Sequence, residues 1–211
     1  MNLKPPKAKT GADKQYDQAY FDRWYRDQGT RVKSSAVMAR KVAMAVAVAE
    51  HYLERPVRSV LDVGCGEGVF GEALAQIRPK CHYLGLDSSE YAVGRFGLKR
   101  NLRLLDFADL AVQRFDRSFD LLVCSDVMHY VPTKALVAGL SGFDELCHGI
   151  GFFEVFCKGD HFVGDLEGFV YRPASWYRRV FLEAGFAPLG THFYLSPSLR
   201  GAATRLELAS I

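Results

Sequence analysis

Short apolar runs alternate with helical patterns from Val57 onward. This alternation is typical of βαβ units and of a mostly parallel sheet. The runs that predict parallel strands are residues 57–63, 82–87, 102–106, 119–125 and 151–157. The run 119–125 is so continuously apolar that we expect a central strand covered on both faces.

The segments between these runs have helical periodicity. They predict helices after the glycine-rich turn through Gln76, and over residues 90–98, 132–147 and 174–184. Pro79 follows the first of these helices and Gly185 ends the last. Ahead of the first strand, residues 15–27 and 34–53 also have a helical pattern.

The end of the chain predicts two strands that are close in sequence. Residues 192–195 and 205–209 are separated only by SPSLRGAAT, which is too short for a helical crossover, so we expect them to pair antiparallel. The sequence therefore predicts a doubly wound, Rossmann-like α/β fold. Its seven-stranded, mostly parallel sheet ends in an antiparallel hairpin, with helices on both faces.

Length and composition favour one domain. A chain of 211 residues that is 49% hydrophobic and 24% charged can bury one good core, and we expect it over residues 15–211. Residues 1–14 have no apolar segment after their lysines and prolines, so they do not fit a secretory signal, and we expect a disordered arm. No run approaches the roughly 20 uncharged apolar residues of a membrane span.

Charge and cysteine spacing exclude several classes of site. The net charge of +3 is largely accounted for by four lysines in the arm, so it does not imply nucleic acid. The five cysteines contain no CxxC pair, which argues against a zinc site and a disulfide framework. We therefore expect no metal and a cytoplasmic protein with reduced thiols.

The most informative segment is LDVGCGEG, residues 61–68. Glycines directly after a strand let backbone N–H groups and a helix N-terminus approach a ligand closely. Gly66, Gly68 and Gly71 fit the GxGxxG pattern of dinucleotide-binding proteins. Asp62 and Gly64, together with Gly66 and Gly68, fit DxGxGxG instead. Taken alone, this loop is ambiguous.

Acidic residues at the strand ends separate the two interpretations. Asp62 has a role if the ligand carries a cationic or donor group beside the loop, such as the amino group of a methionine moiety. Asp87 closes the second strand, where a carboxylate can accept both ribose hydroxyls of either cofactor. Asp106 and Phe107 end the third strand, with a carboxylate for the adenine amino group and an apolar side chain for its ring.

The run of motifs resembles that of the class I S-adenosylmethionine-dependent methyltransferases. LDVGCGEG is followed by YLGLDSS, LRLLDFADL, FDLLVCSDVMHYV, GFFEVF and FLEAGF in the family's order, and the resemblance is clear over residues 57–156. It implies methyl transfer from S-adenosylmethionine and release of S-adenosylhomocysteine. The cofactor contacts that we expect are Asp62, Gly64, Cys65, Gly66, Gly68, Asp87, Ser88, Asp106, Phe107 and Ser125.

Candidate catalytic residues follow the fourth strand. His129 lies at the carboxyl edge of the sheet, where an imidazole can accept a proton from a hydroxyl or amine acceptor. Its alternative roles are helix packing and cofactor shielding. Asp126 is either a surface acid or a site residue. His161 and Asp165 are weaker candidates in the insertion after the fifth strand.

Four N-terminal aromatic residues recur at helical spacing: Tyr16, Tyr20, Trp24 and Tyr25. The pattern predicts a helix that packs its aromatic face on the domain. The family resemblance adds that such a helix often covers the acceptor pocket, so residues 15–53 are a possible lid. We expect Tyr16, Tyr20 and Tyr130 to contact the acceptor.

The sequence defines the class of the methyl acceptor less well than it defines the cofactor. The segment SDVMHY replaces the Asn/Asp-Pro-Pro-aromatic motif of enzymes that methylate base amines, so a nucleic acid is disfavoured and a small-molecule acceptor favoured. Arg172, Arg178 and Arg179 form either a solvated face or a site for an acidic acceptor. Two alternative functions remain, an NAD-dependent oxidoreductase and a non-catalytic cofactor-binding subunit. The sequence predicts no oligomeric state.

Overall fold

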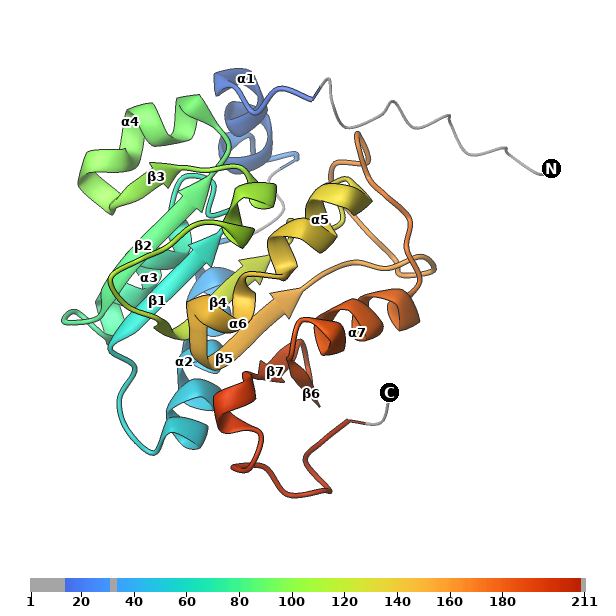
Figure 1. Ribbon diagram of the computed structural model, residues 1–211. Coiled ribbons are helices and arrows are strands. Elements are labelled where there is room, and N and C mark those ends of the chain that lie inside the picture. Colours follow the sequence, from blue (N-terminus) through green and yellow to red (C-terminus); the bar gives the residue numbers. More distant parts are fainter. Residues whose placement is uncertain (1–13, 31–33, 210–211) are drawn as a thin grey trace.

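The structure is a computed structural model that describes residues 14–30 and 34–209 (Figure 1). The disordered arm predicted for residues 1–14 lies outside this range except for Lys14, which is placed against the domain. No helix among the described residues is long and apolar enough to cross a membrane.

One seven-stranded sheet forms the centre of the molecule, in the order β3-β2-β1-β4-β5-β7-β6. The strands are β1 (Ser59–Val63), β2 (His82–Asp87), β3 (Leu102–Leu104), β4 (Phe119–Ser125), β5 (Cys147–Glu154), β6 (Ala187–Gly190) and β7 (Phe193–Leu195). Strands β1 to β5 run parallel, and β7 pairs antiparallel with both β5 and β6. The predicted doubly wound fold is confirmed.

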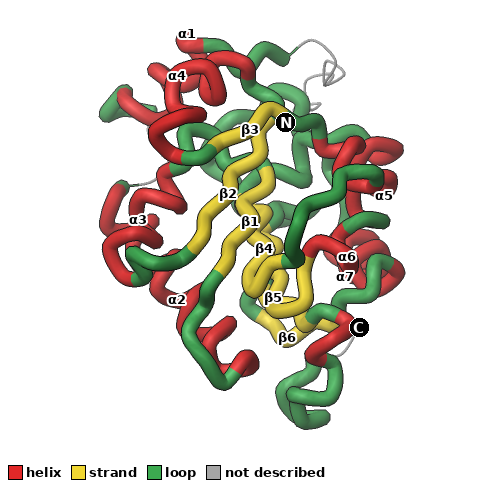
Figure 2. The backbone as a smooth tube through the Cα atoms, turned by 60° about the vertical axis from the view of Figure 1, so that its left-hand side comes forward, coloured by secondary structure: helices red, strands yellow, loops and turns green. Residues whose placement is uncertain are grey.

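Helices cover both faces of the sheet (Figure 2). They are α1 (Gln18–Phe21), α2 (Ser35–Leu53), α3 (Val69–Ile77), α4 (Glu90–Arg100), α5 (Thr133–Leu140), α6 (Phe143–Leu146) and α7 (Ala174–Glu183). Helices α2 and α3 bury apolar residues against one face, and α5, α6 and α7 bury theirs against the other. The central strand β4 is buried through its first six residues, as its apolar sequence predicts.

The predicted hairpin exists, but one of its strands was placed wrongly. The partner of β7 is β6, not residues 205–209, which form turns. The two-residue loop is Thr191–His192, and both residues have positive φ, at 47° and 68°. A tight hairpin turn of this kind usually contains Asn or Gly, so its sequence signal is weak here. Pro188 is tolerated because β6 is the edge strand.

Three other predicted elements differ. The helix predicted over residues 132–147 divides into α5 and α6 at Gly142, whose backbone packs against the Leu110 carbonyl, and β5 then starts earlier than predicted. The helix predicted over residues 15–27 is only the short α1 followed by a π-helical turn, η1 (Asp22–Arg26). The third strand ends at Leu104, and a 3-10 turn, η2 (Phe107–Ala111), follows.

The strand order reverses between β1 and β4, because the chain continues outward to β2 and β3 on one side and to β5 on the other. In open α/β sheets, ligands bind outside the carboxyl ends of the strands at such a switch point. The glycine-rich loop after β1 and the segment after β4 meet there.

Candidate functional site

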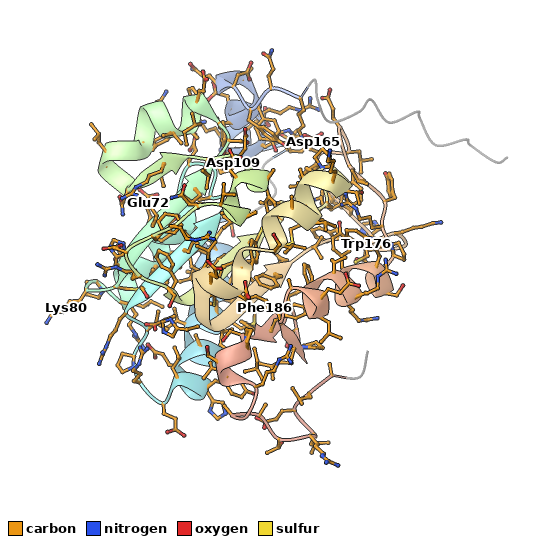
Figure 3. The ribbon with its side chains drawn as sticks, in the orientation of Figure 1. Glu72, Lys80, Asp109, Asp165, Trp176 and Phe186 are labelled. Atoms are coloured by element: carbon orange, nitrogen blue, oxygen red, sulfur yellow. The ribbon has the colours of Figure 1, made fainter. Side chains whose placement is uncertain are left out.

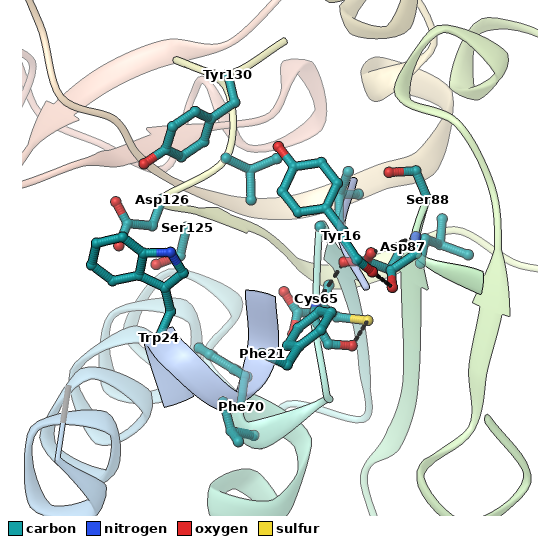
Figure 4. A pocket seen from close by; sticks show the side chains of 18 of the residues that line it. Tyr16, Phe21, Trp24, Cys65, Phe70, Asp87, Ser88, Ser125, Asp126 and Tyr130 are labelled. Atoms are coloured by element: carbon teal, nitrogen blue, oxygen red, sulfur yellow. Dashed lines mark hydrogen bonds between the residues drawn. The ribbon is translucent and has the colours of Figure 1, made fainter. Parts of the chain in front are cut away.

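A cavity of about 1380 Å³ opens at this switch point (Figure 4). Residues after β1, β2, β3 and β4 line it, together with the N-terminal segment and part of the loop that follows β5. Every residue that the sequence predicts to contact cofactor or acceptor lines this cavity, except Gly68. A typical pocket for one ligand has about 300–1,000 Å³, so there is room for two ligands.

The glycine-rich loop takes a backbone conformation that requires glycine. Gly64, Gly66 and Gly68 have φ values of 72°, 55° and 77°. A Cβ on Gly64 would lie 2.4 Å from Val127 Cγ2, and one on Gly66 would lie 2.4 Å from the Tyr25 hydroxyl oxygen. The loop therefore exposes backbone to the cavity at positions where no other residue fits without strain.

Asp87 connects the loop after β1 to the start of α4. Its Oδ2 accepts a hydrogen bond from the Gly66 backbone N–H at 2.7 Å, and its Oδ1 accepts one from the Ser89 N–H at 2.8 Å. Burial raises the pKa of Asp87, and these two bonds oppose the shift. Each oxygen keeps a further lone pair that can accept a bond from a ligand hydroxyl.

Asp62 is a second buried carboxylate, 4% exposed, at the floor of the cavity. The Tyr83 hydroxyl donates to its Oδ2 at 2.7 Å. Burial raises the pKa of Asp62 to about 7, the Tyr83 bond opposes this shift, and the charge of Asp87 adds to it. A cationic ligand group beside Asp62 would favour the ionised form.

Three further residues that we expect to contact the cofactor, Ser88, Asp106 and Phe107, differ in how they are held. Asp106 and Ser88 are exposed at the cavity wall. Phe107 is half-buried, and its ring lies 5.8 Å from that of Phe143, so it also packs under α5. Ser89, not Ser88, caps α4, because its hydroxyl accepts the Ala92 N–H. Ser88 is therefore available to the cavity.

Ser125 belongs to a buried polar cluster that the sequence analysis did not identify. Its hydroxyl donates to Glu154 Oε2 at 2.5 Å, and Lys41 Nζ donates to Ser125 Oγ at 3.0 Å. Lys41 also forms an ion pair with Glu154. Lys41 lies on the buried face of α2, where the sequence pattern predicts core packing. Only the packing of α2 on the sheet shows that its ammonium group reaches this cluster.

The N-terminal segment covers the glycine loop. Phe21 is 2% exposed and its ring stacks on Tyr91 at 5.6 Å, while Tyr25 reaches Gly66. Arg26 pairs with the buried Glu67 at 2.5 Å. The aromatic residues thus both pack on the domain and line the cavity.

Tyr16, Tyr20 and Tyr130 line the cavity and surround the ammonium group of Lys14. The Tyr130 hydroxyl donates to the Asp165 carbonyl at 2.6 Å. Asp165, labelled in Figure 3, also pairs with Lys14 at 2.6 Å through its carboxylate. Burial raises the pKa of all three tyrosines, so their hydroxyls stay protonated at neutral pH.

The structure does not bring His129 into the cavity. The imidazole is fully buried, stacks on Phe169 at 4.7 Å, and has Phe156 and Phe162 as further ring neighbours. Its Nε2 lies 3.7 Å from Asp126 Oδ1. This environment favours the packing role over that of a general base that meets the acceptor.

Arg172 holds the segment after β4 and is not placed to bind an acidic acceptor. It is 5% exposed and donates to the carbonyls of Met128 and Val131, the Thr133 hydroxyl and the Tyr177 hydroxyl. Arg178, Arg179 and His161 are exposed outside the cavity lining. Asp126 lines the cavity with a φ of 70°, a strained value for a residue that is not glycine.

Side chains that could bind a metal do not cluster among the described residues. Within residues 14–30 and 34–209, no set of three or more His, Cys, Asp or Glu side chains is arranged to hold a metal ion. Cys65 is buried beside Gly85 and lines the cavity, and burial raises its pKa well above the ordinary value, so it is held as a neutral thiol.

Comparisons with known proteins agree with this geometry. A family described as "Methyltransferase domain" matches residues 61–153. Trans-aconitate 2-methyltransferase from Deinococcus radiodurans is 38% identical over 79 residues, 37% of this chain and 30% of that protein. Malonyl-[acyl-carrier protein] O-methyltransferase from Legionella pneumophila is 34% identical over 91 residues, 41% and 32% of the two chains. The alignments span about a third of these curated relatives.

Solved structures share the fold over nearly the whole chain. The sugar N-methyltransferase KedS8 from Streptoalloteichus has a TM-score of 0.62 at 17% identity, covering 92% of this chain and 97% of its own. Magnesium protoporphyrin IX methyltransferase from Synechocystis, with bound S-adenosylhomocysteine, has a TM-score of 0.61 at 22% identity, covering 85% and 93%. The family match identifies a methyltransferase domain over residues 61–153, and the solved methyltransferase structures share its fold.

Proposed function

We propose that this protein transfers a methyl group from S-adenosylmethionine to a small-molecule acceptor in the cavity at the switch point. The observation that carries the proposal is the left-handed glycine loop, fixed by Asp87, at the edge of a cavity large enough for two ligands. A dinucleotide oxidoreductase would use the same loop, but the family match is to methyltransferases.

The residues present fit a cofactor that is cationic and rich in hydroxyl donors. Asp62 would hold the amino group of the methionine moiety, and Asp87 the ribose hydroxyls. Asp106 and Phe107 would hold the adenine. Both buried carboxylates are desolvated, and a bound cation or donor offsets that cost.

When bound, S-adenosylmethionine supplies an electrophilic methyl group on a sulfonium that is already a good leaving group. The protein then contributes mainly proximity, alignment and exclusion of water. The segment from Tyr16 to Tyr25 forms one wall of the cavity, and we propose that it closes over the acceptor. His129 is not part of this proposal, because its imidazole lies outside the cavity lining.

A small-molecule acceptor is supported by the curated relatives, whose names include trans-aconitate 2-methyltransferase and ubiquinone biosynthesis O-methyltransferase. The cysteines at positions 65, 81, 124, 147 and 157 are free thiols, which supports a reducing compartment, and we propose the cytoplasm.

Calorimetric titration of the full chain tests the cofactor assignment. S-adenosylhomocysteine should bind and raise the melting temperature, because a ligand that binds only the folded state stabilises it. NAD is the matched control and should do neither. Binding of NAD without binding of S-adenosylhomocysteine would replace the proposal with the oxidoreductase alternative.

A further inference from the structure

Three tyrosine rings surround the ammonium group of Lys14. Its Nζ lies 3.9 Å from the ring centroid of Tyr130, 5.1 Å from that of Tyr16 and 5.2 Å from that of Tyr20. Cations within about 6 Å of a ring centroid are attracted by the negative face of the ring. The three rings therefore form an aromatic cage, a name that we use below for Tyr16, Tyr20 and Tyr130.

A carboxylate completes the cage. Asp165 Oδ2 lies 2.6 Å from Lys14 Nζ, and the Glu167 carbonyl accepts a further bond from the same atom at 3.0 Å. The side chain of Lys14 is 4% exposed and that of Asp165 is 13% exposed. Such a set of two oxygen acceptors and three ring faces is complementary to an ammonium ion that has been removed from water.

The cage belongs to the cavity that contains the glycine loop, because its three rings and Asp165 line that cavity. Tyr16 and Tyr20 lie in the N-terminal segment, whereas Tyr130 and Asp165 follow β4 and β5. The Tyr130 hydroxyl donates to the Asp165 backbone carbonyl at 2.6 Å, which fixes ring and acid relative to each other. The cage therefore lies in the same cavity as the proposed cofactor site.

The charge of the cavity points to a cationic occupant. Among the described lining residues, Lys14 is the one basic side chain and no arginine or histidine is present. The acidic lining residues number eight: Asp17, Asp62, Glu72, Asp87, Glu90, Asp106, Asp126 and Asp165. An acceptor that carries carboxylates would meet mostly like charges, whereas an amine would meet mostly opposite charges.

We propose that the methyl acceptor is a small basic amine whose nitrogen binds in the aromatic cage, and that it displaces the Lys14 ammonium group to do so. This inference rests on the proposed methyltransferase function and names its substrate class. Lys14 occupies the cage as an internal mimic of the acceptor.

The reaction that follows balances. The bound ammonium ion gives one proton to the Asp165 carboxylate, which leaves a lone pair on nitrogen. That pair forms the N–C bond to the methyl group while the C–S bond breaks and its electron pair stays on sulfur. The products are S-adenosylhomocysteine and a methylated ammonium ion, and Asp165 passes its proton to water. Burial lowers the pKa of the Lys14 ammonium in this position, and the hydrogen bond to Asp165 opposes that shift.

The test measures occupancy of the cage without methyl transfer. The probes are the tetramethylammonium ion and neopentyl alcohol, an uncharged molecule of nearly the same shape, titrated into the full chain and followed by ligand-observed NMR. Lys14→Ala should bind tetramethylammonium about tenfold more tightly than the wild type, because the internal competitor is gone. Neopentyl alcohol should bind weakly to both proteins.

Two further variants give the controls. Lys80→Ala removes an exposed lysine at the opposite side of the molecule from Asp165 (Figure 3), and it should leave the affinity at the wild-type value. Tyr130→Leu in the Lys14→Ala background keeps an apolar side chain but removes a ring, and it should reverse most of the gain. Equal binding of both probes, or no gain in Lys14→Ala, would overturn the amine assignment.

Calorimetry with S-adenosylhomocysteine on the same proteins separates this inference from the function beneath it. Binding of S-adenosylhomocysteine with no selective binding of tetramethylammonium overturns the amine acceptor alone. Failure of S-adenosylhomocysteine to bind a folded protein overturns the proposed function, and the amine acceptor with it.

Discussion

Replacing Asp87 by alanine removes two kinds of interaction from the cavity. Inside the protein, its carboxylate accepts the N–H groups of Gly66 and Ser89 at 2.7 and 2.8 Å. In the proposed complex, it also accepts the ribose hydroxyls of the cofactor. The variant therefore tests both the stability of the loop and the assignment of the ribose site.

The two effects have different magnitudes. A buried N–H group left without its acceptor costs about 1–3 kcal/mol, and two are affected, although water entering the cavity offsets part of this. Loss of a pair of charge-assisted bonds to the ribose should weaken binding by about 2–4 kcal/mol, which is about 30- to 700-fold in the dissociation constant. Each kcal/mol of lost stability lowers the melting temperature by about 2–4 °C in a domain of this size.

The assays are thermal melting and calorimetric titration with S-adenosylhomocysteine, on Asp87→Ala, Asp87→Asn and Asp109→Ala. Asparagine keeps one acceptor oxygen, so it should lose less stability than alanine. Asp109 is an exposed acid on η2 outside the cavity lining (Figure 3), and its replacement should change neither quantity. A folded Asp87→Ala protein with wild-type affinity would refute the ribose assignment.

Three further predictions concern the same cavity. Gly66→Val should abolish binding of S-adenosylhomocysteine, because its φ of 55° is strained for a branched residue and its Cβ would displace the Tyr25 hydroxyl; normal calorimetric binding by a folded variant would place the cofactor elsewhere. Affinity for S-adenosylhomocysteine should rise as the pH rises to about 7, because Asp62 ionises there, and Asp62→Asn should flatten this profile. Without ligand, the stability of the wild type should fall as the pH rises from about 4 to about 7, because the folded state holds the Asp62 proton more tightly than the unfolded state. Deletion of residues 1–27 should reduce methyl transfer but leave a folded domain that still binds cofactor. The fragment should be less stable than the full chain, because the buried Phe21 is lost. Full transferase activity of the fragment would reject the lid, and loss of its cooperative melting transition would favour the core interpretation.

Local patterns in the sequence were sufficient for the parallel half of the fold and for the cofactor loop. The five parallel strands are short apolar runs, and the helices between them begin and end at recognisable residues. Gly64, Gly66 and Gly68 indicate a left-handed turn, because few other residues tolerate that conformation. The edge hairpin was misplaced since the turn at Thr191–His192 adopts positive φ without an asparagine or glycine to signal it.

Only the tertiary structure decided which side chains meet in the cavity. His129 follows β4 as a catalytic histidine would, yet the chain after β5 folds aromatic rings around it and closes it off. Lys41 and Lys14 carry no motif, and each reaches its acidic partner through packing of segments that are 113 and 151 residues apart. Sequence periodicity determines which face of an element is buried, but contacts between distant segments depend on how those faces dock, and no local pattern encodes that.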